Sequence, residues 1–172
     1  MNIQSKPSQL IALKANAVPG IRIDVVGLAA HHQPEMERLL LHLDAHSRVS
    51  RFGHWMSDAN LIEHANYAFK KATWIAGAFI NTRLRGLVEM YDSGSGWAEA
   101  SFVVEQDWRR RGIAWTLLQA TEIKAADFNV SALRMIFARN NWPMRGLASK
   151  ADGRYDLVLD EISVDVAIGK AR

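Results

Sequence analysis

Residues 97–118 change their hydrophobic period halfway along, and this limits the folds that the whole chain can adopt. Up to Val104 the stretch has the β-branched and aromatic content of a strand, whereas from Gly112 onward its apolar residues recur at helical spacing. It therefore predicts a strand, a turn and a helix. Three consecutive arginines precede the glycine of the turn. Because the first N–H groups of a helix lack partners and the helix dipole adds positive charge, this turn predicts an anion site.

The turn does not match two common nucleotide-binding patterns. The phosphate-loop pattern GxxxxGK[ST] is absent, and so is GxGxxG, because Gly112 is the only glycine in the turn. The pattern that fits is RxxGxA, formed by Arg109, Gly112 and Ala114 and placed five residues after Val104. A plain basic turn between a strand and a helix is the alternative.

RxxGxA resembles the acyl-CoA motif [QR]xxGx[GA] of the GNAT superfamily of N-acetyltransferases. The resemblance implies an α/β (α+β) fold with a mixed, mainly antiparallel sheet flanked by helices, and acetyl-CoA as co-substrate. It also implies that the turn holds the CoA diphosphate and that the preceding strand lines the pantetheine arm. The residues implied for the diphosphate are Arg109, Arg110, Arg111, Gly112, Ile113 and Ala114. Those implied for pantetheine are Phe102, Val103 and Val104.

Length and composition favour one domain. With 172 residues, 49% of them hydrophobic, we expect an arm or edge segment over residues 1–20 and a single acyltransferase domain over residues 21–172. The net charge of +3 suits an anionic ligand such as CoA and does not require nucleic acid. The absence of cysteine fits a reducing compartment, and we expect a cytoplasmic protein. No stretch approaches the ~20 apolar residues of a membrane span, so we expect no membrane partner.

Periodicity predicts the remaining elements. Strands are expected over residues 21–26, 73–80, 84–91, 132–138, 155–159 and 161–166, and helices around residues 36–43 and 61–69. A further helix is indicated after Asn141, which can act as its cap, with Pro143 in the first turn. Short turns between residues 73 and 104 predict three consecutive antiparallel strands.

Two other patterns lie between residues 31 and 64. All six histidines fall there, but His42 is not followed by the glutamate that a zinc-protease helix needs. We therefore expect no metal site and interpret these histidines as partly exposed polar residues. Residues 47–52, SRVSRF, resemble a stretch of the bacterial branch that includes protein lysine acetyltransferases, where it lies on the acceptor side. Loop arginines that pair with local carboxylates are the equal alternative for Arg48 and Arg51.

In the same superfamily, the pattern NxxAxxLYxxxG begins with an asparagine that often reaches pantetheine. By resemblance Asn141 takes that place, with Met144 for the alanine, Leu147 for the leucine and Gly153 near the expected glycine. At the tyrosine position, whose hydroxyl protonates the departing CoA thiolate in many members, stands Ala148. Loss of the tyrosine hydroxyl should slow the reaction rather than prevent it, because a thiol pKa near ~8.5 makes the thiolate a tolerable leaving group. This difference from the family pattern keeps open a second hypothesis, that the protein is a non-catalytic acyl-CoA-binding module.

Acyl transfer to an amine calls for a base. An alkyl ammonium of pKa about 10.4 is almost fully protonated at pH 7, and a carboxylate can accept its proton. Glu99 is the first candidate, since it lies on the predicted strand five residues before Val104 and lysine-modifying acetyltransferases look similar there. Glu89 on the preceding strand and Glu105 at the strand end are the reserves. An exposed strand carboxylate without a catalytic role is the alternative for Glu99. The sequence thus predicts direct transfer from acetyl-CoA to a primary amine, on a small molecule or a protein lysine, without a metal. A homodimer paired through the last strands would be in keeping with the superfamily.

Overall fold

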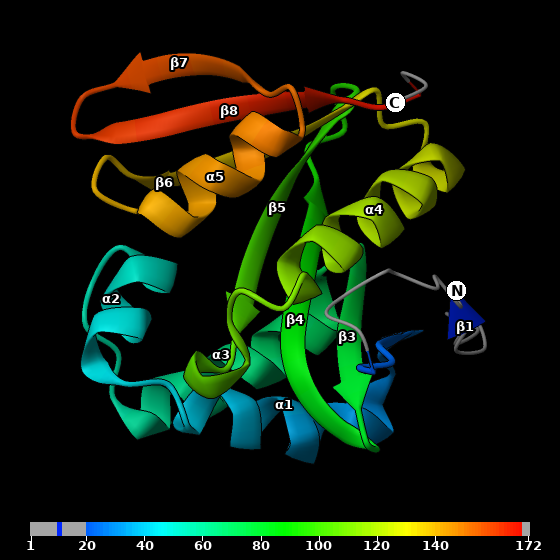
Figure 1. Ribbon diagram of the computed structural model, residues 1–172, viewed down its shortest axis with the longest axis vertical. Helices are drawn as coiled ribbons and strands as arrows, with labels where there is room; N and C mark the ends of the chain where they lie inside the picture. The colour runs from blue at the N-terminus through cyan, green and yellow to red at the C-terminus, as the bar shows by residue number, and fades with distance from the viewer. Residues whose placement is uncertain (1–9, 12–19, 170–172) are drawn as a thin grey trace.

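An eight-stranded mixed sheet runs through the molecule in the order β1-β2-β3-β4-β5-β6-β8-β7 (Figure 1). The computed structural model describes residues 10–11 and 20–169. The strands are β1 (Leu10–Ile11), β2 (Asp24–Gly27), β3 (Trp74–Ile80), β4 (Arg83–Asp92), β5 (Trp97–Val104), β6 (Ala132–Ala138), β7 (Arg154–Val158) and β8 (Glu161–Ala167). The helices are α1 (Gln33–Leu41), α2 (Ala45–Phe52), α3 (Asp58–Lys71), α4 (Ile113–Ala125) and α5 (Trp142–Lys150).

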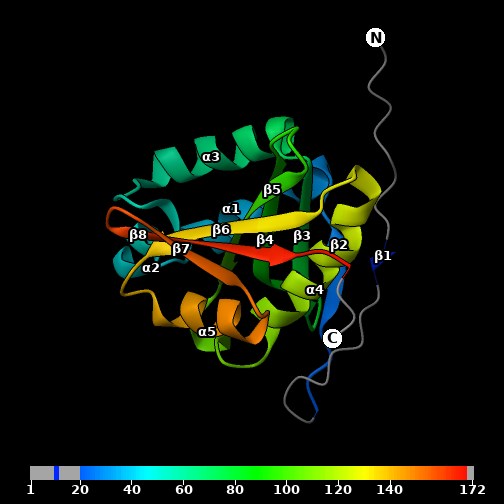
Figure 2. The same cartoon turned by 90° about the horizontal axis from the view of Figure 1, so that it is seen from above.

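The larger helices cover the two faces of the sheet. Helices α1 and α3 pack on one face and α4 and α5 on the other, as Figure 2 shows from above. One buried cluster joins α4 and α5 to the sheet and includes Leu117 and Leu133. A second joins α1 and α3 to the opposite face and includes Leu39 and Leu61. Each helix thus buries the apolar stripe that its 3.6-residue period brings together.

Strands β3, β4 and β5 form the predicted antiparallel run. Between β3 and β4, Asn81 and Thr82 adopt positive φ values of 49° and 65°, the geometry of a tight hairpin turn. Between β4 and β5, Gly94 and Gly96 supply positive φ values of 73° and 81°. The later strands and the helix that begins after Asn141 also lie close to their predicted positions.

Two elements differ from the prediction. The strand expected over residues 21–26 is β2, shifted toward Gly27, because its pairing with β3 begins at Asp24. Residues 45–52, for which the apolar pattern predicts no helix of their own, form α2. The Asp44 carboxylate accepts a hydrogen bond from the N–H of Ser47 at 2.7 Å, and Gly53 follows the helix with φ 76°. These start and stop signals outweigh the weak apolar period of the segment.

Part of the expected N-terminal arm lies at the edge of the sheet. Leu10 and Ile11 pair antiparallel with Val26 and Val25, as the edge-segment interpretation requires. Residues 1–9 and 12–19 of that arm lie outside the described residues, so the boundary between arm and domain stays a prediction. Among the described helices, none is long and apolar enough to cross a membrane.

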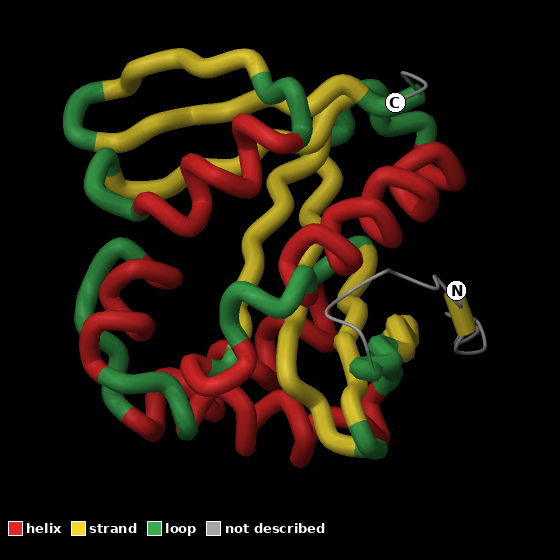
Figure 3. The backbone as a smooth tube through the Cα atoms, in the orientation of Figure 1, coloured by secondary structure: helices red, strands yellow, loops and turns green. Residues whose placement is uncertain are grey.

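The parallel pair between β5 and β6 is short. Only Trp97, Ala98 and Glu99 of β5 pair with β6, although β5 continues to Val104 and β6 to Ala138. Figure 3 shows the two strands diverging beyond this point. The sheet therefore opens between residues 100–104 of β5 and residues 135–138 of β6, and we call this opening the splay.

Truncating Leu117 should destabilise the fold strongly. The side chain is fully buried between α4 and the sheet, so Leu117→Ala should lower the free energy of unfolding by about 2–5 kcal/mol. Ile123 on the same helix is 54% exposed, and Ile123→Ala should cost less than about 1 kcal/mol. Urea denaturation measures both values. Equal losses would show that the buried face of α4 has been assigned incorrectly.

Candidate active site

The main chain between β5 and α4 forms a turn rich in unpaired amides. A short 3-10 turn, Gln106–Trp108, follows β5, and Arg110 and Gly112 then adopt left-handed conformations with φ of 61° and 82°. No side chain caps the start of α4. In the part of the chain that the structure describes, the N–H groups of residues 110–114 donate to no main-chain or side-chain acceptor. A helix start of this kind is complementary to an anion such as a diphosphate.

Strand β5 runs along one side of the splay. The side chains of Phe102 and Val103 are buried on opposite faces of the sheet, and Val104 packs partly against the α4 cluster. Because β6 does not pair with β5 at these positions, it is the main chain of these residues that faces the splay. The predicted pantetheine contact at residues 102–104 would therefore be a main-chain contact.

The three arginines of the motif take different positions on the turn. The Arg109 side chain turns back toward the splay, where its Nε donates to the carbonyl oxygen of Val104 at 3.2 Å and its Nη2 donates to Ser47 Oγ at 2.7 Å. The Arg111 guanidinium lies over the Trp108 ring, 4.7 Å from its centroid. Arg110 is exposed. No pattern in the sequence signals the contact between Arg109 and α2.

Asn141 lies on the other side of the splay, at the start of α5. Its Oδ1 accepts a hydrogen bond from the N–H of Met144 at 3.2 Å, so the predicted cap is confirmed. Its Nδ2 donates to Ser50 Oγ of α2 at 2.9 Å. Helix α2 therefore contacts residues on both sides of the splay. Ala148, at the family's tyrosine position, is fully buried in the core.

Glu99 lies at the point where the pairing of β5 with β6 stops. Its side chain is exposed, and its neighbours across the sheet are Tyr91 on β4 and Arg134 on β6. Arg134 does not neutralise Glu99, because its guanidinium makes two hydrogen bonds, of 2.7 and 2.8 Å, with the carboxylate of Asp165. Among residues 20–169 no side chain pairs with the Glu99 carboxylate. The Glu99 carboxylate is therefore held by no ion pair within the described part of the chain.

Glu89, a reserve candidate for the base, is fully buried on the same face of the sheet. It accepts hydrogen bonds from Arg51 Nη2 at 2.8 Å, His64 Nε2 at 3.0 Å and the Tyr91 hydroxyl at 2.8 Å. Burial alone would raise the pKa of Glu89, but the charge of Arg51 and the hydrogen bonds of His64 and Tyr91 lower that pKa to about 2. A carboxylate held in this way stays ionised and is a weak base.

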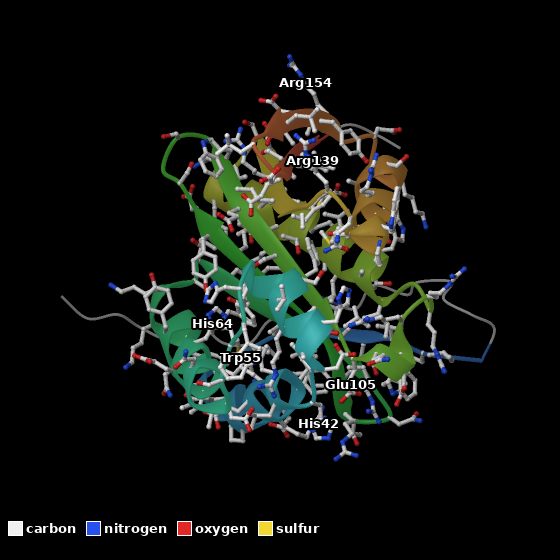
Figure 4. The ribbon with its side chains drawn as sticks, turned by 90° about the vertical axis from the view of Figure 1, so that its left-hand side faces the viewer. His42, Trp55, His64, Glu105, Arg139 and Arg154 are labelled. Atoms are coloured by element: carbon white, nitrogen blue, oxygen red, sulfur yellow. The ribbon has the colours of Figure 1, made fainter. Side chains whose placement is uncertain are left out.

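No pattern in the sequence connects the three donors of this cluster. Arg51 comes from α2, His64 from α3 and Tyr91 from β4, and no spacing in the chain links them. Burial and the neighbouring Glu89 raise the pKa of the Tyr91 phenol, so Tyr91 remains protonated and donates. Figure 4 shows His64 beside α2. Within the described residues, no three histidine, aspartate or glutamate side chains converge as metal ligands.

Glu105, the other reserve candidate, is held by two arginines at the far end of β5. Its carboxylate bonds Arg38 Nη1 at 2.7 Å and Arg85 Nη1, and its side chain is 10% exposed. Burial would raise the pKa of Glu105, but the hydrogen bonds from Arg38 and Arg85 lower it. In Figure 4, Glu105 and His64 lie on either side of α2. Glu105 is therefore a weak base as well, and of the three carboxylates only Glu99 is unpaired.

Comparison with known proteins identifies the family. The model of the Acetyltransferase (GNAT) family matches residues 31–152, which include β5, the amide turn and Asn141. The chain belongs to this family. It is therefore an acetyl-CoA-dependent N-acetyltransferase by family. Among curated proteins, no sequence matches the chain significantly.

Solved structures confirm the GNAT fold. The GNAT domain of S. lividans PAT is 14% identical, with a TM-score of 0.77 over 95% of this chain and 99% of that one. RimL, a ribosomal alpha-N-protein acetyltransferase in complex with coenzyme A, is 12% identical, with a TM-score of 0.72 over 91% and 97%. The PaiA N-acetyltransferase from Thermoplasma acidophilum, also in complex with coenzyme A, is 14% identical, with a TM-score of 0.66 over 84% and 98%. At these identities the likeness concerns the fold.

Replacing Glu89 by glutamine should make the free energy of unfolding less dependent on pH in the acid range. Its folded pKa of about 2 lies below the ordinary value of 4.5, so the ionised group stabilises the fold above about pH 5. This contribution is lost as the pH falls toward the folded pKa. Between pH 6 and pH 3 the wild type should lose about 2 kcal/mol more unfolding free energy than Glu89→Gln, as measured by denaturation at each pH. Equal losses in the two proteins would contradict the pairing of Glu89.

Proposed function

We propose that the protein transfers the acetyl group of acetyl-CoA directly to a primary amine, with Glu99 as general base. The observation that carries this proposal is the arrangement of an unpaired carboxylate at the closed end of the splay and an amide turn at its open end. The two features are joined by one strand, because Glu99 lies within β5 and the amide turn follows the end of β5. This chain belongs to a family whose members use acetyl-CoA.

The cofactor would lie along β5. Its diphosphate would accept hydrogen bonds from the amides of the turn, from Arg110 to Ala114, with the positive charge of Arg109 beside them. Its pantetheine arm would follow the main chain of residues 102–104, with Asn141 on the opposite side of the splay. Main-chain N–H groups of β5 would polarise the thioester carbonyl, which is an electrostatic role that does not depend on side-chain identity.

The base is needed because the acceptor enters the site protonated. At pH 7, removing a proton from an alkyl ammonium of pKa about 10.4 costs about 4 to 5 kcal/mol before the amine can attack. Glu99 is exposed and lacks a cationic partner among the described residues, whereas Glu89 and Glu105 are paired with arginines. Glu99 can therefore accept the proton directly or through a water.

The leaving thiolate departs without a tyrosine at the family position. Ala148 is fully buried and offers no proton. The Tyr91 hydroxyl donates to Glu89, and its raised pKa makes it a poor acid. Because a thiol of pKa about 8.5 is a tolerable leaving group, the thiolate can take its proton from water or take the proton that the acceptor amine has lost.

The acceptor would approach from the sheet face that carries α3. Glu99 lies on this face, together with its cross-strand neighbour Tyr91 and the Glu89 cluster. RimL is named for a protein α-amino acceptor, and the SRVSRF resemblance points to protein lysines. Small-molecule amines meet the same chemical requirement. The proposed acceptor class is therefore a primary amine.

Replacing Glu99 by glutamine should lower the turnover of a primary amine about 10²- to 10⁴-fold, because the variant keeps the shape of the side chain but loses the base. The KM for acetyl-CoA should change less than about threefold, since Glu99 is not placed against the diphosphate or the pantetheine. A thiol-release assay over a panel of amines, followed by kinetics on the best acceptor, measures both constants.

Glu161→Gln is the matched control, because Glu161 is an exposed strand carboxylate on β8. It should leave both constants unchanged. Full activity of Glu99→Gln would remove Glu99 from the mechanism. Acetyl-CoA binding with no turnover of any amine would instead favour the acyl-CoA-binding module.

A further inference from the structure

The arginines of helix α2 tie it to the rest of the molecule by hydrogen bonds, in addition to the packing of Phe52 against the α1 and α3 cluster. Arg48 donates to three main-chain carbonyls, those of Leu41, Leu43 and Met56, at 3.0 to 3.1 Å. Arg51 pairs with the buried Glu89 at 2.8 Å. A helix fixed by directional charge-assisted hydrogen bonds has a defined position and rotation. Its remaining side chains are therefore presented in a defined direction.

The two serines of α2 bond the two residues that lie on either side of the splay. Ser47 Oγ accepts from Arg109 Nη2 at 2.7 Å, and Ser50 Oγ accepts from Asn141 Nδ2 at 2.9 Å. Residues three apart share one face of a helix, so both hydroxyls point toward the splay. Arg109 and Asn141 are 62 and 91 positions away from their serine partners. One short helix thus links the turn after β5 to the start of α5.

Both partners keep donors free after bonding the serines. An arginine side chain has five N–H groups, and Arg109 uses two of them, on Ser47 and on the carbonyl of Val104. The Asn141 amide has two N–H groups, and one is used on Ser50. The serines therefore orient these groups without consuming their capacity to bind a ligand.

We propose that Ser47 and Ser50 are positioning residues for the cofactor. Ser47 acts through Arg109 on the diphosphate, and Ser50 acts through Asn141 on the pantetheine arm. This inference rests on the proposed function, because it takes acetyl-CoA as the ligand of the splay. It assigns to the SRVSRF segment a role on the cofactor side in addition to its contact with Glu89.

Electrostatics of the N-terminus of α2 agree with this geometry. Hydrogen bonds from the side chain and the N–H of Ser47 lower the pKa of the capping Asp44 carboxyl, and the charge of Arg109 lowers it further. Arg109 therefore interacts with the capped end of α2 through Ser47 and through its charge. The contact between the turn and the helix does not depend on a single hydrogen bond.

Calorimetric titration with two probes separates the roles of the two serines. Coenzyme A carries both the diphosphate and pantetheine, whereas 3′-phosphoadenosine 5′-diphosphate carries only the diphosphate half. Ser47→Ala should weaken the binding of both probes by about three- to tenfold, the loss expected for one hydrogen bond to a charged or polar partner. Ser50→Ala should weaken the binding of coenzyme A by a similar factor and leave the binding of the diphosphate fragment unchanged.

A double-mutant cycle gives a second measurement. In an Arg109→Ala background, Ser47→Ala should have no further effect on coenzyme A binding, because its partner is gone. Ser95→Ala, at an exposed serine in the turn between β4 and β5, is the control and should bind both probes like the wild type. Unfolding curves of the variants verify that α2 is retained.

The outcomes distinguish this inference from the proposed function. If the wild type binds coenzyme A and both serine variants bind it equally well, the positioning role is wrong and the proposed function stands. If Ser50→Ala weakens both probes to the same extent, the serine supports the fold in general and its assignment to pantetheine is wrong. If the wild type binds neither probe, the proposed function itself fails.

Discussion

The early end of the parallel pairing between β5 and β6 is the constraint on which the rest of the site depends. Only residues 97–99 of β5 pair with β6, and residues 100–104 pair with β4 alone. Buried main-chain groups need partners, and Arg109 supplies one by donating to the carbonyl of Val104. The core cluster under α4 and α5 contains buried side chains of both β5 and β6, and it holds the two strands in these diverging positions. The opening is thus built into the packing of the sheet.

Two carboxylates on one face of the sheet have opposite environments. Glu89 is buried and surrounded by Arg51, His64 and Tyr91, which lower its pKa to about 2. Glu89 pairs across the sheet with Ser101, and Glu99 lies two residues before Ser101 on the same strand. The Glu99 side chain is exposed. The first holds α2 and α3 against the sheet, and the second is left available for chemistry. Separation of structural and reactive carboxylates by environment is a general way to obtain different roles from one residue type.

Local patterns in the sequence predicted most of the fold. The strand, turn and helix of residues 97–125, the antiparallel run before them and the Asn141 cap depend on residues close together in the chain, so periodicity and cap chemistry suffice to predict them. Helix α2 was missed because its sequence, AHSRVSRF, has little apolar periodicity and relies on Asp44 and Gly53 at its ends.

The contacts that organise the site could not be predicted in this way. The bond from Arg51 to Glu89 joins residues 38 positions apart, and the bond from Asn141 to Ser50 joins residues 91 positions apart. No spacing rule reports such pairs, because they form only when the sheet brings separate elements together. The strand position of Glu99 and the family resemblance indicate this residue, but only the burial and the arginine partners of Glu89 and Glu105 distinguish it from them.

The most direct test of the cofactor site is calorimetric titration of acetyl-CoA into the wild type, Gly112→Asp and Gly94→Asp. Both glycines have positive φ, 82° and 73°, so the two substitutions carry a similar backbone strain and the same added charge. Only Gly112 lies in the amide turn, where a carboxylate would repel the diphosphate. We expect micromolar binding by the wild type and by Gly94→Asp, and none by folded Gly112→Asp. Absence of binding by the wild type, or equal binding by Gly112→Asp, would contradict the assignment of this turn to the cofactor.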